Sequence, residues 1–217
     1  MARLKVGVPI SGRGSNMAAL AEACADPGFP AEIVLVLSNE PDAAGLERAQ
    51  AFGIPTAVVD HRGFPDRAAF DAAMTARLEA AGADFVCLAG FMRLLTAGFV
   101  ERWRDRLLNV HPSLLPAFRG LDTHERALAA GVRLHGCTVH FVRPELDDGP
   151  IVMQAAVPVL PDDTADSLAA RVLAQEHRIY PAALRLVAEG AVRVEGERVV
   201  HRRGWPGGSA LAAPPLP

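Results

Sequence analysis

Short apolar runs alternate with helix-patterned segments through the first hundred residues, and this alternation limits the folds open to the chain. The runs have the length of strands and cover Leu4–Ile10, Ile33–Leu37, Ile54–Val59 and Phe85–Ala89. Between them, apolar residues recur at helical spacing over about Ser15–Cys24, Ala43–Phe52 and Asp66–Ala81. Strands that alternate with helices form a parallel sheet covered on both faces. We therefore predict an α/β fold with an open, twisted parallel sheet in this half.

The pattern changes after Asn109. Two β-rich runs, Thr138–Val142 and Ile151–Val159, are joined by a loop rich in Gly, Pro and Asp. We interpret them as strands added to the sheet in antiparallel orientation. The predicted architecture is thus a sheet with a parallel N-terminal half, antiparallel additions in the C-terminal half and helices on both faces.

The last part of the chain predicts a long helix and a hairpin. The helix spans Thr164–Gly190, with Thr164 as N-cap and Gly190 just past its end. Ala191–Val200 is typical of an edge hairpin. Residues 201–217 contain Gly-Gly and Pro-Pro with few large apolar side chains, which indicates a flexible tail. We expect one domain over residues 1–200.

Charge argues against nucleic acid as a partner. The 22 Lys and Arg residues are outnumbered by 25 Asp and Glu residues, so the formal net charge is −3. Neutralising many phosphates requires an excess of basic side chains. A small anion held at one local site stays compatible with this balance.

The cysteines and apolar runs indicate a cytoplasmic protein with no membrane contact. Cys24, Cys87 and Cys137 are odd in number and form no CxxC pair, which argues against a disulfide framework or a zinc cluster. The most apolar stretch is interrupted by Arg93 and is too short to span a bilayer. The N-terminal apolar run reaches glycine too soon for a signal peptide.

A glycine-containing loop, Gly12-Arg13-Gly14-Ser15-Asn16, lies between the first predicted strand and helix. A helix N-terminus offers free N–H groups and partial positive charge, so we expect a phosphate to bind there. Met17 replaces the glycine of a dinucleotide-binding pattern, and no Gly-Lys-Ser/Thr follows, so neither NAD binding nor ATP hydrolysis is indicated. A plain strand-to-helix turn with Ser15 as N-cap is the alternative.

Asn109 and His111 end an apolar run just before Pro112. Alternation along a strand places both on one face, and the carboxyl ends of such strands carry ligand sites in open α/β sheets. An amide donor beside an imidazole suits a developing oxyanion. The alternative is an Asn–His pair that only closes a loop.

The acidic segment Glu145–Asp148 offers a carboxylate to His111. An ionised neighbour favours the imidazolium form of histidine. We expect one of Asp147 and Asp148 to point inward, unless the segment is only a solvated turn.

The apolar cluster Phe91, Met92, Leu94 and Leu95 follows the fourth predicted strand. It is either ordinary core or the lining of a pocket for a flat heterocycle. Arg67 and Arg93 are near it in sequence and could meet acidic groups of a ligand. His135, Cys137 and His140 do not share one face of a strand, so we expect no metal site.

Together these segments resemble the phosphoribosylglycinamide formyltransferase family over about residues 4–200. The Asn-x-His-Pro-Ser-Leu-Leu-Pro segment is specific to folate formyl-transferring enzymes, and the Gly-Ser-Asn and Gln-Glu-His segments narrow the match to the glycinamide enzyme. The Phe118-Arg119-Gly120 loop departs from this and resembles the methionyl-tRNA formyltransferase version. The matching stretches are Ile10–Asn16, Leu88–Leu95, Leu108–Pro116, His135–Phe141, Glu145–Asp147 and Gln175–Pro181.

The resemblance implies a Rossmann-like nucleotide half at about 1–100, a folate and catalytic half at about 101–200, and no metal. It implies formyl transfer from 10-formyltetrahydrofolate to glycinamide ribonucleotide in purine synthesis, by a monomer or weak homodimer. Asn109, His111 and Asp147 match the catalytic trio. Gly14, Ser15 and Asn16 match the phosphate loop, and Glu176 matches a residue near the amine. The matches to the folate site are Arg67, Met92, Arg93, Leu94, Leu95 and Asn109.

Three other functions are alternatives to formyl transfer to glycinamide ribonucleotide. In a formyltetrahydrofolate deformylase, water would replace the amine, but the related hydrolases carry an extra N-terminal domain and the first strand here begins at Leu4. In a tRNA formyltransferase, a basic C-terminal domain would be expected. A non-catalytic folate or nucleotide sensor would have no need for the set Asn109, His111 and Asp147.

Overall fold

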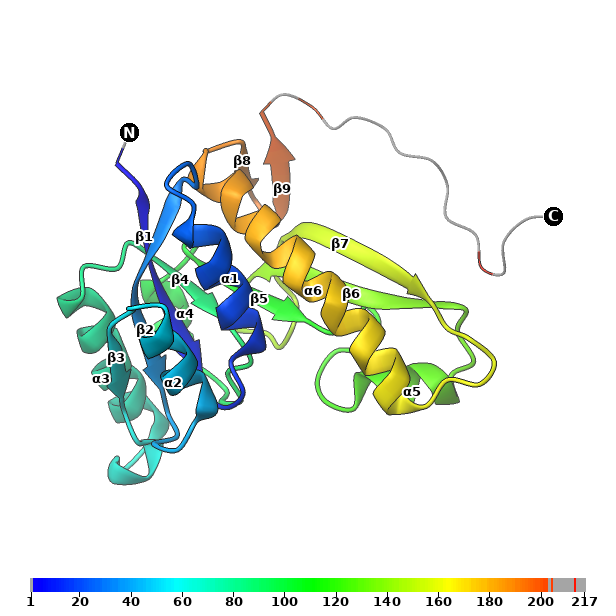
Figure 1. Ribbon diagram of the computed structural model, residues 1–217, viewed down its shortest axis with the longest axis horizontal. Coiled ribbons are helices and arrows are strands. Elements are labelled where there is room, and N and C mark those ends of the chain that lie inside the picture. Colours follow the sequence, from blue (N-terminus) through cyan, green and yellow to red (C-terminus); the bar gives the residue numbers. More distant parts are fainter. Residues whose placement is uncertain (1, 203, 205–212, 214–217) are drawn as a thin grey trace.

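Within the residues described by the computed structural model (2–202, 204 and 213), seven strands form one mixed sheet (Figure 1). Their order is β3-β2-β1-β4-β5-β6-β7, with the first five parallel and the last two antiparallel to their neighbours. The predicted architecture is therefore confirmed. The strands are β1 (Leu4–Ile10), β2 (Ala31–Ser38), β3 (Thr56–Val58), β4 (Phe85–Leu88), β5 (Leu107–His111), β6 (Leu134–Phe141) and β7 (Ile151–Pro158).

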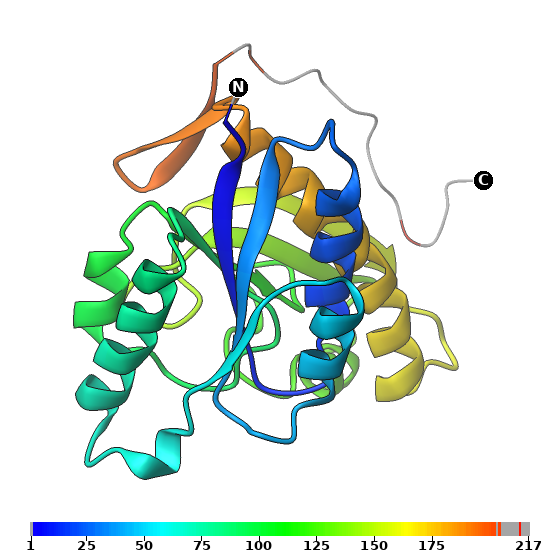
Figure 2. The ribbon, with the colours of Figure 1, turned by 60° about the vertical axis from the view of Figure 1, so that its left-hand side comes forward.

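Helices cover both faces of the sheet, as Figure 2 shows. One face packs against α1 (Ser15–Ala25), α2 (Ala44–Ala51) and α6 (Ala165–Ala188), and the other against α3 (Arg67–Ala80) and α4 (Ala97–Arg102). Each face has its own apolar core because the central strands are buried on both sides. The remaining helical elements are α5 (Thr123–Ala129) and a single 3₁₀ turn at His61–Gly63.

The long C-terminal helix begins where its capping residues predict. The Thr164 hydroxyl accepts from the Ser167 N–H, and the Ser167 hydroxyl accepts from the Thr164 N–H. Gly190, just past the helix, has a φ of 62°, which suits a glycine. Farther along the helix, the buried Tyr180 hydroxyl lies 2.8 Å from the Leu88 carbonyl oxygen and 3.2 Å from that of Leu108. Tyr180 thus ties α6 to the end of β4 and the start of β5.

Some predicted boundaries differ. β3 is shorter than the run Ile54–Val59, and β6 starts four residues before Thr138 because pairing with β7 extends back to Leu134. α4 was not predicted; its cap is Thr96, whose hydroxyl accepts from the Phe99 N–H.

The predicted hairpin is present as β8 (Val192–Glu195) and β9 (Arg198–His201), but it forms its own two-stranded sheet and not an edge of the main one. The buried guanidinium of Arg143 fastens it to the domain, 2.8 Å from Glu197 in the hairpin turn and 2.8 Å from Asp105. The tail prediction for 201–217 lies outside the described residues except at 201, 202, 204 and 213. In the described part, no helix is both long and apolar enough to cross a membrane.

We expect Tyr180→Phe to lower the free energy of unfolding by about 1–3 kcal/mol, because the ring is kept while two strand carbonyls lose a buried donor. Urea denaturation measures the change. An unchanged midpoint would show that α6 is held by apolar packing alone.

Candidate active site

The end of β5 carries both predicted catalytic side chains. In the antiparallel register of β5 and β6, Asn109 faces His140 and His111 faces Thr138. Cross-strand partners lie on the same face of a sheet. These four side chains therefore project together beside the loops that follow the strands.

Asp147 completes the cluster from the loop between β6 and β7. Its Oδ2 lies 3.4 Å from His111 Nδ1 and accepts a hydrogen bond of 2.9 Å from the Gly120 N–H. The carboxylate is only 9% exposed. Asp148 points outward instead and pairs with Arg119. The structure thus brings Asn109, His111 and Asp147 together, with Asp147 as the inward carboxylate.

The Phe118-Arg119-Gly120 loop holds this arrangement from the opposite side. His111 Nε2 lies 3.0 Å from the Phe118 carbonyl oxygen. A carbonyl only accepts, so Nε2 carries a proton, and the Asp147 carboxylate lies beside the other ring nitrogen, Nδ1. Phe118 and Asp147 both have positive φ, 53° and 50°, a conformation that costs side chains energy and clusters at functional sites.

His140 is a member of the cluster that the sequence interpretation missed. Its Nδ1 lies 2.9 Å from the Phe141 carbonyl and its Nε2 lies 3.4 Å from Asn109 Nδ2. Burial lowers the pKa of His140 to about 4, against the smaller raising effects of Phe141 and Asp147. The ring is therefore neutral at physiological pH, with its proton on Nδ1 and a lone pair on Nε2. That lone pair orients the amide nitrogen of Asn109.

Gly149 lets the Asp147 loop close on the sheet. A Cβ at this position would lie 1.6 Å from the Phe141 carbonyl oxygen. The loop backbone can approach β6 this closely only at glycine. The Asp-Asp-Gly segment is thus built into the site and is not only a solvated turn.

The glycine loop after β1 differs from the prediction at its cap. Gly14, with a φ of 68°, is the N-cap of α1, and Ser15 is its first helical residue. A Cβ at Gly14 would lie 2.7 Å from Gly45 Cα, so α2 packs directly on the loop. The N-cap role predicted for Ser15 as an alternative is therefore wrong, because the left-handed Gly14 already makes the turn.

Asn16 and Glu176 are joined although 160 residues separate them. Asn16 Nδ2 donates to Glu176 Oε2 at 2.7 Å, between the start of α1 and the middle of α6. Burial raises the pKa of Glu176, and the hydrogen bond from Asn16 lowers it by a smaller amount. Two of the predicted ribonucleotide residues thus meet at one point.

The predicted folate residues form an exposed segment instead of core. Met92 is 71% and Leu94 60% exposed, Arg93 is also exposed, and Leu95 is half-buried. Arg67 is exposed at the start of α3. The core alternative for this cluster is therefore wrong for Met92 and Leu94.

In the described part of the chain, no group of three or more His, Cys, Asp or Glu side chains could hold a metal ion. His135 pairs with His124, 3.2 Å from Nε2 to Nδ1.

Comparison with known proteins decides the family. The model of the formyl transferase family matches residues 4–184. Phosphoribosylglycinamide formyltransferase from Escherichia coli (strain K12) is 44% identical over 191 residues, which are 88% of this chain and 90% of that protein. The chain belongs to the phosphoribosylglycinamide formyltransferase family. The family resemblance predicted from the sequence motifs is thereby confirmed.

Solved structures and longer relatives agree. Glycinamide ribonucleotide transformylase 1 from Symbiobacterium toebii is 49% identical with a TM-score of 0.90, covering 92% of this chain and 94% of that one. The trifunctional purine biosynthetic protein adenosine-3 of Bos taurus is 50% identical over 192 residues, or 88% of this chain. The chain spans 19% of the length of that trifunctional relative.

We expect Glu176→Gln to stabilise the fold most at neutral pH. Because the folded-state pKa is raised, the ionised carboxylate costs stability above that pKa, and the cost is relieved as pH falls through it. The excess of the variant's melting temperature over the parent's should therefore shrink from pH 7 toward pH 4.5, the ordinary value for glutamate. A constant difference across this range would contradict the buried, ionised Glu176.

Proposed function

We propose that this chain transfers the formyl group of 10-formyltetrahydrofolate to the amine of glycinamide ribonucleotide in purine synthesis, acting in the cytoplasm as a monomer or weak homodimer. What supports the proposal most is the convergence of Asn109, His111 and Asp147 at the carboxyl end of β5, with the His111–Asp147 contact at 3.4 Å. Family membership supports the same reaction.

The two substrates would approach this cluster from opposite sides. The phosphate would lie on the N–H groups of Gly14, Ser15 and Asn16, where the dipole of α1 attracts an anion. Glu176, held by Asn16, would accept from the amine. On the other side, Met92, Arg93, Leu94 and Leu95 would receive the folate ring, and Arg67 its acidic part.

The formyl transfer forms one carbon–nitrogen bond and breaks another. The amine nitrogen bonds to the formyl carbon, and the carbonyl electron pair moves to oxygen, which becomes an oxyanion. One N–H of the Asn109 amide faces His140, and the other donates to that oxygen. The Phe118 carbonyl holds the Nε2 proton of His111, so His111 stabilises the oxyanion by its positive charge and not by donating that proton. The oxyanion then returns its electron pair to the carbon and re-forms the carbonyl as the bond from that carbon to the folate nitrogen breaks. Asp147 maintains the charge on His111 and, directly or through water, helps a proton pass from the amine to the folate nitrogen.

Formylfolate consumption tests the reaction class. We expect the absorbance change of formylfolate to require glycinamide ribonucleotide, with formylated ribonucleotide as product. Consumption that ignores the ribonucleotide would favour the hydrolase, and binding of either compound without consumption would favour the sensor.

Two substitutions test the roles. We expect Asn109→Ala to lower kcat by about 10²–10³-fold, the usual effect of losing one oxyanion donor.

Asp147→Asn keeps the shape but removes the charge, so kcat should fall while both ligands still bind. Steady-state kinetics with ligand titrations measure both, and near-normal turnover in either variant would contradict its assigned role.

A further inference from the structure

The segment 91–96 is held at its ends by polar side chains, while Phe91 and Leu95 pack partly against the core. At its C-terminal end, the buried carboxylate of Asp71 accepts from Thr96 N at 2.7 Å and from Thr96 Oγ1 at 2.6 Å. At its N-terminal end, Ser11 Oγ accepts from the Met92 N–H at 2.8 Å. Met92 and Leu94 are largely exposed, so near Met92 the backbone is positioned by the hydrogen bond to Ser11.

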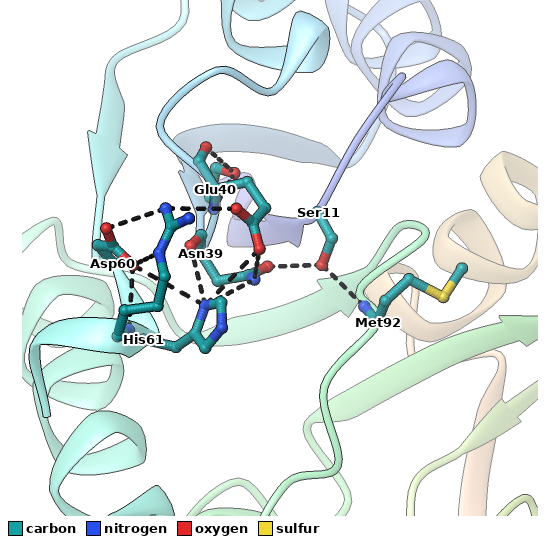
Figure 3. A network of polar contacts seen from close by, with 8 residues as sticks. Ser11, Asn39, Glu40, Asp60, His61 and Met92 are labelled. Atoms are coloured by element: carbon teal, nitrogen blue, oxygen red, sulfur yellow. Dashed lines mark hydrogen bonds and ion pairs between the residues drawn. The ribbon is translucent and has the colours of Figure 1, made fainter. Parts of the chain in front are cut away.

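The direction of the Ser11 hydrogen bonds is determined by a chain of partners (Figure 3). The Glu40 carboxylate can only accept, so the Asn39 amide turns its Nδ2 toward it, at 3.2 Å, and its Oδ1 toward Ser11. Ser11 Oγ therefore donates to Asn39 Oδ1, at 2.5 Å, and keeps a lone pair for Met92. Arg62, 3.5 Å from Glu40, keeps that carboxylate in place.

Ser11 directly precedes the glycine loop, Gly12–Asn16. Its N–H donates to the Gly90 carbonyl at 3.2 Å, so the loop and the segment are joined at two points. Beyond it, the Gly12 carbonyl accepts from Gly45 N at 2.9 Å, and Gly14 packs on Gly45. Residues 11–14 are therefore tied both to the segment at Met92 and to the start of α2 at Gly45.

We propose that the Ser11 hydroxyl, oriented by Asn39, is a positioning group that couples the two substrate sites, so that ribonucleotide bound at Gly14–Asn16 raises the affinity of segment 91–95 for folate. The inference rests on the proposed function, because it takes these two places as the ribonucleotide and folate sites. Linkage then requires the reverse effect of the same size, folate raising ribonucleotide affinity.

Isothermal titration calorimetry with tetrahydrofolate, which carries no formyl group to transfer, measures the coupling directly. In the parent protein we expect saturating glycinamide ribonucleotide to lower the Kd of tetrahydrofolate by about 5-fold or more, within the usual range of coupling between sites. In Ser11→Ala, saturating ribonucleotide should lower the Kd of tetrahydrofolate by less than about 2-fold. The Kd for ribonucleotide alone should change little. Ser11→Thr, which keeps the hydroxyl, should retain the coupling.

Ser167→Ala is the matched control, because it loses a capping hydroxyl at the start of α6, in a different part of the fold. It should be destabilised yet keep the parent ratio. Loss of coupling in both alanine variants would assign the effect to destabilisation and overturn the proposal. Independent binding of both ligands by the parent would overturn the coupling alone, whereas failure of the parent to bind either would overturn the proposed function and the coupling with it.

Discussion

The buried carboxylate of Asp147 is the group around which the site is organised. A charge that is 9% exposed is tolerated only with partners, and the nearest are the imidazole of His111 and the Gly120 N–H. The first fixes the loop after β6 to the end of β5, and the second fixes it to the loop 118–120. Phe118 then closes the arrangement from the other ring nitrogen of His111. The end of β5, the loop 118–120 and the loop after β6 are thus joined through one carboxylate.

The sheet topology makes this contact possible. Parallel strands bring the loops after β1, β4 and β5 to one edge, where the glycine loop, the exposed segment 91–96 and the Asn109–His111 pair meet. The antiparallel β6 then runs back along β5 and places His140 opposite Asn109. If β6 ran parallel to β5, it would end at this edge, as β1, β4 and β5 do. The loop that carries Asp147 would then begin from a different place.

Sequence reasoning succeeded where the information is local. Apolar periodicity predicted most strands and helices, the caps of α6 were readable from Thr164 and Gly190, and spacing along a strand placed Asn109 and His111 on one face. Motifs then carried the family resemblance. These features depend on residues that are neighbours in the chain.

The rest depends on long-range pairing. His140 entered the site through a strand register that no local pattern determines, and at the sequence level it was considered only as a poor metal ligand. Phe118 acts through its backbone carbonyl, so its residue type gives no signal in the sequence. Gly14 and not Ser15 is the cap because its left-handed backbone makes the turn, and the contact of the hairpin with Arg143 joins residues 54 positions apart.

A crystal structure with glycinamide ribonucleotide and a folate that carries a non-transferable carbonyl in place of the formyl group tests the central claim most directly. We expect the carbonyl oxygen to lie about 3 Å from Asn109 Nδ2, with the amine on the far side of the carbonyl carbon and the Asp147 carboxylate still at His111. A carbonyl oxygen turned away from Asn109, with the ribonucleotide amine out of reach of its carbon, would contradict it.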